Sequence, residues 1–151
     1  MITERLNLPF RKNCEGYFYD GKGNILAKDN GKGILLFPGG GINENENPEQ
    51  AIIRETFEET GAVIKNLRKL GELKFIWGEN WAQSEKQKNR YYHYQGEEMT
   101  FFTGEISTFG EVEVKEDDFW DSEKFLSIEN AIHIIKHFFD FQLLKNYFLL
   151  K

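Results

Sequence analysis

A run of acidic side chains between two glycines is the part of this chain best suited to chemistry. Its charged and glycine positions stand at fixed separations: Gly40, Glu46, Arg54, Glu55, Glu58, Glu59 and Gly61. Glu58 and Glu59 follow Glu55 by three and four positions, so on a helix the three carboxylates would rise from one face. Carboxylates this close repel one another, at a cost on the order of 4 kcal/mol for a pair about 4 Å apart, unless a cation lies among them. The spacing therefore predicts a cation site.

Oxygen ligands of this kind suit hard cations such as Mg²⁺ or Mn²⁺. In proteins, Mg²⁺ is commonly held by one or two carboxylates together with phosphates of the substrate. The acidic run therefore indicates a site for diphosphate chemistry. The alternative is a solvated acidic helix face, which explains most such runs. The glycines and the arginine that stand in register with the glutamates favour the functional interpretation.

A helix is expected over these glutamates because both of its ends carry sequence signals. Asn47 can cap the amino-terminal end, Pro48 suits the first helical position, and Gln50 can complete a capping box. Gly61 is the residue type that most often follows the last helical residue. The signals predict a helix of about fourteen residues.

The same positions resemble the Nudix box, a motif written G-x5-E-x7-R-E-U-x-E-E-x-G-U, in which U is a bulky apolar residue. Residues 40–62 match it at every charged and glycine position, whereas Thr56 and Ala62 depart from it at two apolar positions. The resemblance implies a single Nudix hydrolase domain over residues 1–151, folded as an α/β/α sandwich with a central mixed sheet. It also implies a Mg²⁺-dependent hydrolase of nucleoside diphosphates linked to another group, acting on phosphoric anhydride bonds.

The resemblance also assigns roles. Glu55, Glu58 and Glu59 are the implied metal ligands. Arg54 stands four positions before Glu58, where an ion pair could fix the rotamer of that ligand. The base that activates the attacking water is either a box glutamate or an acidic residue outside the box, and the outside candidates are Glu97, Glu98, Glu116, Asp117 and Asp118. Glu116 is preferred because it precedes residues 125–131 by about the distance at which MutT-like members carry a fourth acidic ligand.

Substrate contacts are expected from two segments. Glycines allow the backbone to approach a ligand closely and to present N–H groups, and here they are Gly39, Gly40 and Gly41. Residues 78–96 form a polar segment that is too long for an ordinary connection. The side chains in and beside it that are expected to stack on a base or meet phosphates are Trp77, Trp81, Arg90 and Tyr92. The alternative is that the rings only pack this segment onto the domain.

Substrate identity depends on residues outside the box. No proline follows the box by fifteen or sixteen residues, as in ADP-ribose diphosphatases, and no tyrosine follows it by sixteen to eighteen, as in diadenosine polyphosphate hydrolases. A MutT-like nucleoside triphosphate or modified-nucleotide diphosphatase is therefore the default interpretation. The alternatives are an ADP-ribose or dinucleoside polyphosphate hydrolase and a non-enzymatic nucleotide sensor, although a sensor can lose the glutamates that this chain keeps. An isopentenyl diphosphate isomerase relative would need a nucleophilic cysteine in its own motif, which Cys14 does not supply.

The charge composition of the chain indicates which kinds of molecule it can bind. The net charge of -6 and the pI of about 5.2 argue against a basic nucleic-acid-binding face, and hence against an RNA decapping enzyme. A small nucleotide is the expected substrate. The amino terminus has no apolar leader region and no apolar run is long enough to span a bilayer, so a cytoplasmic protein is expected. The apolar tail over residues 141–150 suggests a possible homodimer.

Alternating and apolar runs predict the strands that position the site. They cover residues 14–19, 25–28, 34–37, 63–64, 69–77, 99–106 and 125–126. Cys14 lies in the first of them and is expected to be a small buried side chain. Gly71 is expected to mark a bulge, and Ser127 to cap a last helix with one apolar face.

Overall fold

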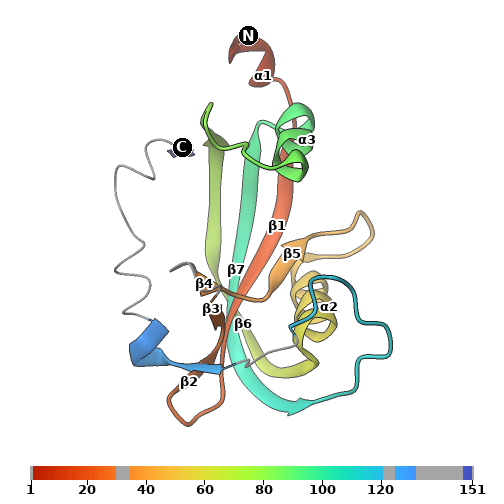
Figure 1. Ribbon diagram of the computed structural model, residues 1–151, viewed down its shortest axis with the longest axis vertical. Coiled ribbons are helices and arrows are strands. Elements are labelled where there is room, and N and C mark those ends of the chain that lie inside the picture. The colour runs from red at the N-terminus through yellow and green to blue at the C-terminus, as the bar shows by residue number, and fades with distance from the viewer. Residues whose placement is uncertain (1, 30–34, 121–124, 132–147, 151) are drawn as a thin grey trace.

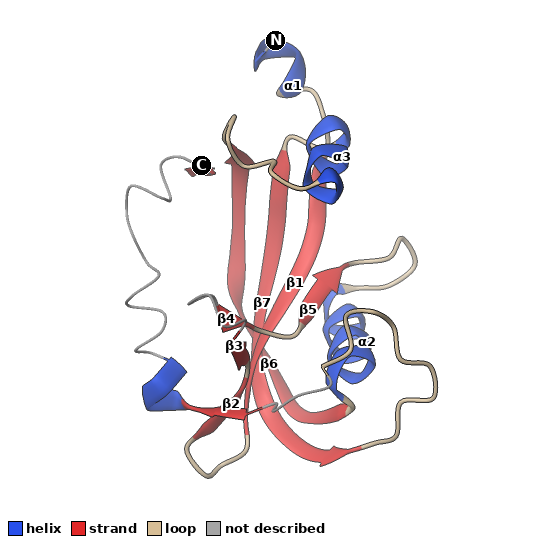
Figure 2. Ribbon diagram, in the orientation of Figure 1, coloured by secondary structure: helices blue, strands red, loops and turns tan. Residues whose placement is uncertain are grey.

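A mixed sheet forms the centre of the molecule, which is known from a computed structural model that describes residues 2–29, 35–120, 125–131 and 148–150. Figures 1 and 2 show three long strands side by side, with the helices placed around them. The strands of this sheet are β1 (Phe10–Tyr19), β2 (Asn24–Leu26), β5 (Gly39–Gly41), β6 (Ala62–Trp77), β7 (Gly96–Phe109), β8 (Phe125–Ser127) and β9 (Phe148–Leu150). A separate two-stranded sheet consists of β3 (Lys28–Asp29) and β4 (Leu35–Leu36).

The strand order of the large sheet is β8-β2-β1-β7-β6-β9, and β5 also pairs with β1. Strands β1 and β7 are parallel over their whole paired length, from Phe10 opposite Gly96 to Tyr19 opposite Glu105. The other pairs in this sheet are antiparallel. The sheet is therefore mixed, as predicted.

Strand β1 shows how the sequence divides the two faces of the sheet. Successive side chains of a strand point to opposite faces. Cys14 and Phe18 are buried on one face, whereas Arg11, Asn13 and Glu15 are only half-buried on the other. The second face is polar, and it faces the site described below.

Helix α2 (Pro48–Thr60) packs against β1, β5 and β6. Two shorter helices, α1 (Ile2–Arg5) and α3 (Glu85–His93), lie together at the opposite end of the long strands (Figure 1). Residues 128–131 are also helical, and the Ser127 hydroxyl accepts a hydrogen bond from the Asn130 backbone N–H at 3.1 Å, as an N-cap does. The rest of that predicted helix, and most of the tail proposed for dimerisation, lie outside the described residues.

The apolar interior has two parts. The larger one lies beneath α2 and includes Phe18, Ile52, Phe102 and Trp120. The smaller one lies near α3 and consists of Phe75, Trp77, Trp81 and Met99. No helix within the described residues is both long and apolar enough to cross a membrane.

Two predictions about local structure need correction. Residues 63–64 and 69–77 are parts of one strand, β6, in which the pairing register shifts between Lys69 and Gly71, where the bulge was expected. Residues 78–96 are not an irregular segment, because α3 occupies their centre. Ser84 and Gln87 form a capping box at its start, a signal that the sequence carries and that the interpretation as a loop overlooked.

Candidate active site

Helix α2 begins and ends as its sequence signals predicted. The Asn47 side chain accepts from the Gln50 N–H at 2.8 Å, and the Gln50 side chain accepts from the Asn47 N–H at 2.9 Å. At the other end Gly61 adopts φ 79°, and its N–H donates to the Phe57 carbonyl at 2.8 Å. A Cβ atom at Gly61 would lie 2.8 Å from the Gly110 carbonyl oxygen, so a side chain is excluded by both conformation and space. These ends fix where the glutamates of the helix stand.

Arg54 is the centre of a hydrogen-bond network among the box residues. Its Nη1 donates to Glu55 Oε1 at 3.0 Å and to Glu58 Oε2 at 3.1 Å. Its Nη2 donates to Glu46 Oε1 at 2.6 Å and to the Gly41 carbonyl at 3.1 Å, while Nε donates to Glu46 Oε2 at 3.0 Å. The bidentate pairing lowers the pKa of Glu46. The predicted Arg54–Glu58 ion pair is present, and the same guanidinium also links α2 to β5.

Glu55 lies directly against the glycine run. A Cβ atom added at Gly40 would come within 2.6 Å of the Glu55 carboxylate, so any larger residue would displace it. Burial raises the pKa of Glu55, and its bond from Arg54 offsets part of that rise. The glycine therefore gives the carboxylate room beside the backbone of β5.

Glu59 is the most deeply buried of the box glutamates. It is 8% exposed, and its Oε1 accepts a hydrogen bond from the Gly39 N–H at 2.9 Å. Burial raises its pKa to about 8, and repulsion from Glu55, Asp118 and Glu58 adds to the rise. The carboxylates thus oppose one another's ionisation, which is the electrostatic condition that a bound cation would relieve.

Asp118 reaches this charge cluster from a loop far along the chain. The Trp120 backbone N–H donates to the Glu59 carbonyl at 2.8 Å, and the Trp120 ring is buried in the main core. These two contacts anchor the loop against α2. Asp118 then contributes to the raised pKa values of both Glu55 and Glu59.

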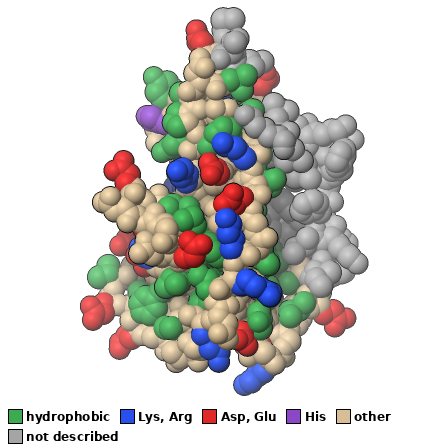
Figure 3. Space-filling model, turned by 180° about the vertical axis from the view of Figure 1, so that it is seen from behind, with side chains coloured by type: hydrophobic (Ala, Val, Ile, Leu, Met, Phe, Trp, Pro, Cys, Tyr) green, Lys and Arg blue, Asp and Glu red, His purple; other side chains and the backbone are tan. Residues whose placement is uncertain are grey.

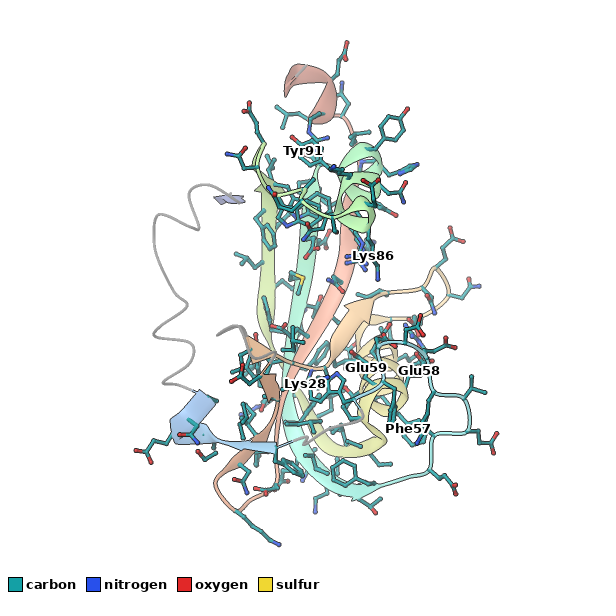
Figure 4. The ribbon with its side chains drawn as sticks, viewed as in Figure 1. Lys28, Phe57, Glu58, Glu59, Lys86 and Tyr91 are labelled. Carbon is teal, nitrogen blue, oxygen red and sulfur yellow. The ribbon has the colours of Figure 1, made fainter. Side chains whose placement is uncertain are left out.

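A cleft of about 420 Å³ brings together β1, the glycine run, α2, α3 and the Asp118 loop. Glu55 and Asp118 bring carboxylates to it, and β1 and α3 bring basic side chains together with Glu15 of β1. Its lining residues are Arg11, Asn13, Cys14, Glu15, Phe37, Gly39, Gly40, Gly41, Glu55, Lys86, Arg90, Met99 and Asp118. Figure 4 shows Lys86 on the side of α3 that faces β5, with Glu58 and Glu59 on α2 beyond it.

The cleft contains only some of the residues predicted from sequence. Gly39, Gly40, Gly41, Glu55 and Arg90 line it. Glu59 touches its edge through the bond to Gly39.

Glu116 instead lines a separate depression of about 470 Å³, together with Glu58. Of the acidic candidates outside the box, Asp118 is the one that shares the cleft with Glu55.

The aromatic residues expected at the substrate lie elsewhere. Trp77 and Trp81 are 2% and 9% exposed and stack on each other with ring centroids 3.8 Å apart. Tyr92 is 77% exposed and lines a different cleft, between α1 and α3. The structure therefore places the two tryptophans as packing residues and puts Tyr92 outside the cleft. The physical reason is that Trp77, at the end of β6, and Trp81, before α3, pack in the smaller core, whereas Tyr92 lies on the face of α3 towards α1.

Sequence reasoning missed the residues that β1 and α3 bring to the cleft, namely Arg11, Asn13, Glu15 and Lys86. The polar alternation of Arg11, Asn13 and Glu15 was the available signal for the first three, since alternate positions of a strand share one face. Lys86 and Arg90 are four positions apart, so a helix would have placed them side by side. Cys14, by contrast, is buried as predicted, and burial raises the pKa of its thiol to about 12.

Hydrogen bonds from Arg54 and Gly39 fix the side-chain orientations of Glu55, Glu58 and Glu59. Among the described residues, no three His, Cys, Asp or Glu side chains are arranged to hold one metal ion. Glu55 and Glu58 both point to Arg54 Nη1, and Glu59 points to the Gly39 N–H. The donor set nevertheless suits a hard divalent cation, because every group is a carboxylate and the cluster carries excess negative charge.

Comparison with known proteins agrees with the fold. A profile of the NUDIX domain matches residues 15–144. A NUDIX hydrolase from Nitrosomonas europaea superposes with a TM-score of 0.58 at 16% identity, covering 90% of this chain and 84% of that one. A Bacillus subtilis pyrophosphohydrolase superposes with a TM-score of 0.50 at 22% identity, covering 77% of this chain and 61% of the other. At these identities the likeness concerns the fold.

Curated relatives match a shorter stretch. An RNA pyrophosphohydrolase of Actinobacillus succinogenes is 47% identical over 69 residues, which is 45% of this chain and 34% of that protein. An RNA pyrophosphohydrolase of Yersinia enterocolitica is 37% identical over 75 residues, which is 49% of this chain and 40% of that protein. The match thus spans well under half of each relative. The profile match over most of the chain, with the intact box on α2 and the mixed sheet around it, shows that the protein belongs to the Nudix family.

Proposed function

We propose that this protein hydrolyses a phosphoric anhydride bond in a nucleoside 5′-polyphosphate, with Mg²⁺ or Mn²⁺ as its cofactor. The observation that carries the proposal is the composition of the cleft. The acidic side chains of Glu15, Glu55 and Asp118 line it together with a bare glycine backbone and with the basic side chains of Arg11, Lys86 and Arg90. Acidic groups that can hold a cation and basic groups that can meet phosphates are what a polyphosphate substrate requires.

Glu55, Glu58 and Glu59 are the proposed holders of the ion. When bound, the ion would neutralise the bridging phosphates and lower the pKa of a coordinated water. Arg54 positions Glu55 and Glu58 through the bonds from its Nη1. It does not reach the cleft lining itself, so we assign it a positioning role.

A carboxylate must accept the proton of the attacking water before phosphorus is attacked. Asp118 is our assignment for this base, because it lines the same cleft as Glu55 and interacts with Glu55 and Glu59. Glu116, the sequence-based choice, lies beside Glu58 in the neighbouring depression and is the second candidate. Comparing Asp118→Asn with Glu116→Gln distinguishes the two, since only the variant that removes the base loses most of its turnover.

A small nucleotide is the preferred substrate, in keeping with the MutT-like interpretation. The net charge is -6. On the face seen in Figure 3, basic and acidic side chains of the described residues are interspersed rather than gathered into one basic area. Long nucleic acids usually require such an area.

The 5′ end of an RNA is the second candidate substrate. It is favoured by one observation: the curated relatives that share the box region at 37–47% identity are named RNA pyrophosphohydrolases. An RNA end presents the same triphosphate as a free nucleotide. A cleft that meets only the terminal nucleotide would need no extended basic surface.

A substrate panel with Mg²⁺ tests the proposal. It should contain nucleoside triphosphates, oxidised nucleotides, nucleotide sugars, ADP-ribose, dinucleoside polyphosphates and a 5′-triphosphorylated oligonucleotide. Release of phosphate or diphosphate from at least one of them, abolished by EDTA and restored by Mg²⁺, is the expected result. Binding without turnover across the panel would instead identify a nucleotide sensor. We also propose that residues 1–151 form a single domain and that the protein is cytoplasmic.

A further inference from the structure

The basic side of the cleft is formed by three side chains from two distant elements. Lys86 and Arg90 stand one helical turn apart on α3, and Arg11 comes from β1. Figure 4 shows Lys86 projecting from α3 towards β5, whereas Tyr91 lies on the side of α3 towards α1. Helix α3 therefore has one face on this cleft and another on the cleft between α1 and α3, where Lys88, Tyr91 and Tyr92 lie.

Arg11 is placed beside the glycine run by its surroundings. Its Nη1 lies 3.6 Å from Glu97 Oε1, and both side chains are largely buried. A Cβ atom at Gly41 would lie 3.2 Å from Arg11 Nη2, so the absence of a side chain there leaves space for the guanidinium. Arg11 is thus located next to the same backbone that borders Glu55.

Arg90 faces Arg11 without a close acidic partner of its own. Burial and the charge of Arg11 both lower the pKa of Arg90, and Glu97 offsets only part of this. Within the described part of the chain, no salt bridge joins Lys86 or Arg90 to an acidic side chain. Arg11 and Arg90 therefore share Glu97, and Lys86 adds a third cation to the same cleft. Glu15 is the other acidic side chain beside Glu97, and burial raises its pKa, which disfavours its charged form. This arrangement favours a bound anion.

We propose that Arg11, Lys86 and Arg90 bind the terminal phosphates of a 5′-triphosphate, which makes the substrate a molecule with a free triphosphate end rather than an end-capped diphosphate. The inference rests on the proposed function, because it places the reacting bond at the Glu55 side of the same cleft. A terminal phosphate carries close to two negative charges near neutral pH. A phosphate esterified on both sides carries only one and leaves the three cations undercompensated. Guanidinium groups also match phosphate oxygens bidentately.

The first test measures the affinity of the protein for inorganic tripolyphosphate by calorimetry. EDTA is present so that no metal-dependent hydrolysis proceeds. Lys86→Gln/Arg90→Gln should bind tripolyphosphate at least about tenfold more weakly than the wild type. Lys88→Gln is the control for loss of positive charge on α3, because it removes one of these charges from the other face of the same helix, and it should change the affinity less than about twofold. Equal losses in the two variants, or none in the double variant, would overturn the assignment. Circular dichroism of each variant checks that α3 remains folded, and Arg90→Lys should recover part of the affinity.

Kinetics provides the second test. In the double variant the KM for a nucleoside triphosphate should rise about tenfold while the KM for ADP-ribose, which lacks a terminal phosphate, stays within about twofold. An equal rise for both substrates contradicts the proposal. A 5′-triphosphorylated oligonucleotide is measured beside the free nucleotide. A KM increase with either one supports the site and identifies which source of the triphosphate it uses.

The two tests separate this inference from the proposed function. If the wild type hydrolyses nothing in the panel but the double variant still loses tripolyphosphate affinity, the hydrolase proposal fails and the phosphate site stands. If the wild type is active and the double variant matches it in both measurements, the site assignment fails and the hydrolase proposal stands.

Discussion

The acidic and basic groups of the site differ in how firmly their side chains are held. We call Glu55, Glu58 and Glu59 of α2 together with Asp118 the acidic wall, and Arg11, Lys86 and Arg90 the basic wall. On the acidic wall, the carboxylates of Glu55, Glu58 and Glu59 are each held by a hydrogen bond of 2.9–3.1 Å from Arg54 or Gly39. On the basic wall, the one salt bridge among described residues is the 3.6 Å contact of Arg11 with Glu97. Groups that take part in bond breaking need fixed geometry, whereas groups that only attract an anion do not.

The supporting helices differ in the same way. Helix α2 buries Ala51, Ile52 and Thr56 against the sheet. Helix α3 has no fully buried side chain. It is held at its end by Arg5, whose guanidinium lies 3.3 Å from the centre of the Tyr91 ring and donates to the Tyr91 and Tyr94 carbonyls. We infer that α2 is the stable frame of the site and that α3, which carries Lys86 and Arg90, opens locally at lower cost.

Removing a carboxylate from the acidic wall should have the largest effect on catalysis. Glu58→Gln and Glu59→Gln should each lower kcat about 100-fold or more, equivalent to about 3 kcal/mol in the barrier. Neither change should unfold the protein, because losing a like charge relieves repulsion. The melting temperature in EDTA should therefore hold or rise. Near-normal turnover in both variants would remove the metal-site interpretation.

Arg54 tests whether the acidic wall needs its fixed geometry. Arg54→Lys keeps the charge but cannot make the bonds to Glu46, Glu55, Glu58 and the Gly41 carbonyl together. We expect kcat to fall about 10- to 100-fold, as for other residues that orient metal ligands. Lys86→Arg on the basic wall is the comparison, and it should leave kcat within about twofold. Equal effects would show that the two walls do not differ in tolerance.

The pH dependence of stability gives a smaller and separate test of the acidic wall. The folded pKa of Glu59 is raised to about 8, above the value of an unperturbed glutamate, about 4.3. The folded state therefore binds the proton of Glu59 more tightly than the unfolded state does. Protonation of Glu59 stabilises the fold fully below about pH 4.3, and this stabilisation is lost as pH rises through about 8.

In EDTA, the wild-type melting temperature should therefore fall relative to Glu59→Gln between about pH 5 and pH 8, by at least about 3 °C. Thermal denaturation of both proteins over this range measures the difference. Parallel curves would show that the pKa of Glu59 is not raised in the folded state. Added Mg²⁺ should reduce the difference, because it stabilises the ionised carboxylates of the native state.

The acidic wall could largely be predicted from sequence because the residues that form most of it lie close together along the chain. The helix, its caps, the Arg54–Glu58 pair and the place of the glycines all follow from spacing within residues 40–62. The basic wall depends on pairing between distant segments. Arg11 reaches the cleft only because β1 lies between β5 and β7, and no periodicity along the chain shows that order. Asp118 likewise depends on the contact of Trp120 with Glu59. Helix α3 was predictable from its capping box, whereas the packing of Trp77 against Trp81 was not visible from local spacing.

Substitution of the aromatic residues near α3 should have the smallest effect on KM, in contrast to substitution of Lys86 and Arg90 in the basic wall. Trp81 stacks on Trp77 in the smaller core, so Trp81→Ala should lower the free energy of unfolding by about 3 kcal/mol. Tyr92 is exposed, so Tyr92→Ala should change it by less than about 0.5 kcal/mol. At a temperature where both variants are folded, neither should alter the KM for a nucleoside triphosphate by more than about twofold, because neither ring lines the cleft. Urea denaturation and steady-state kinetics on the same preparations measure both quantities. A tenfold rise in KM for Tyr92→Ala without loss of stability would mean that the substrate extends over α3 and contacts both clefts.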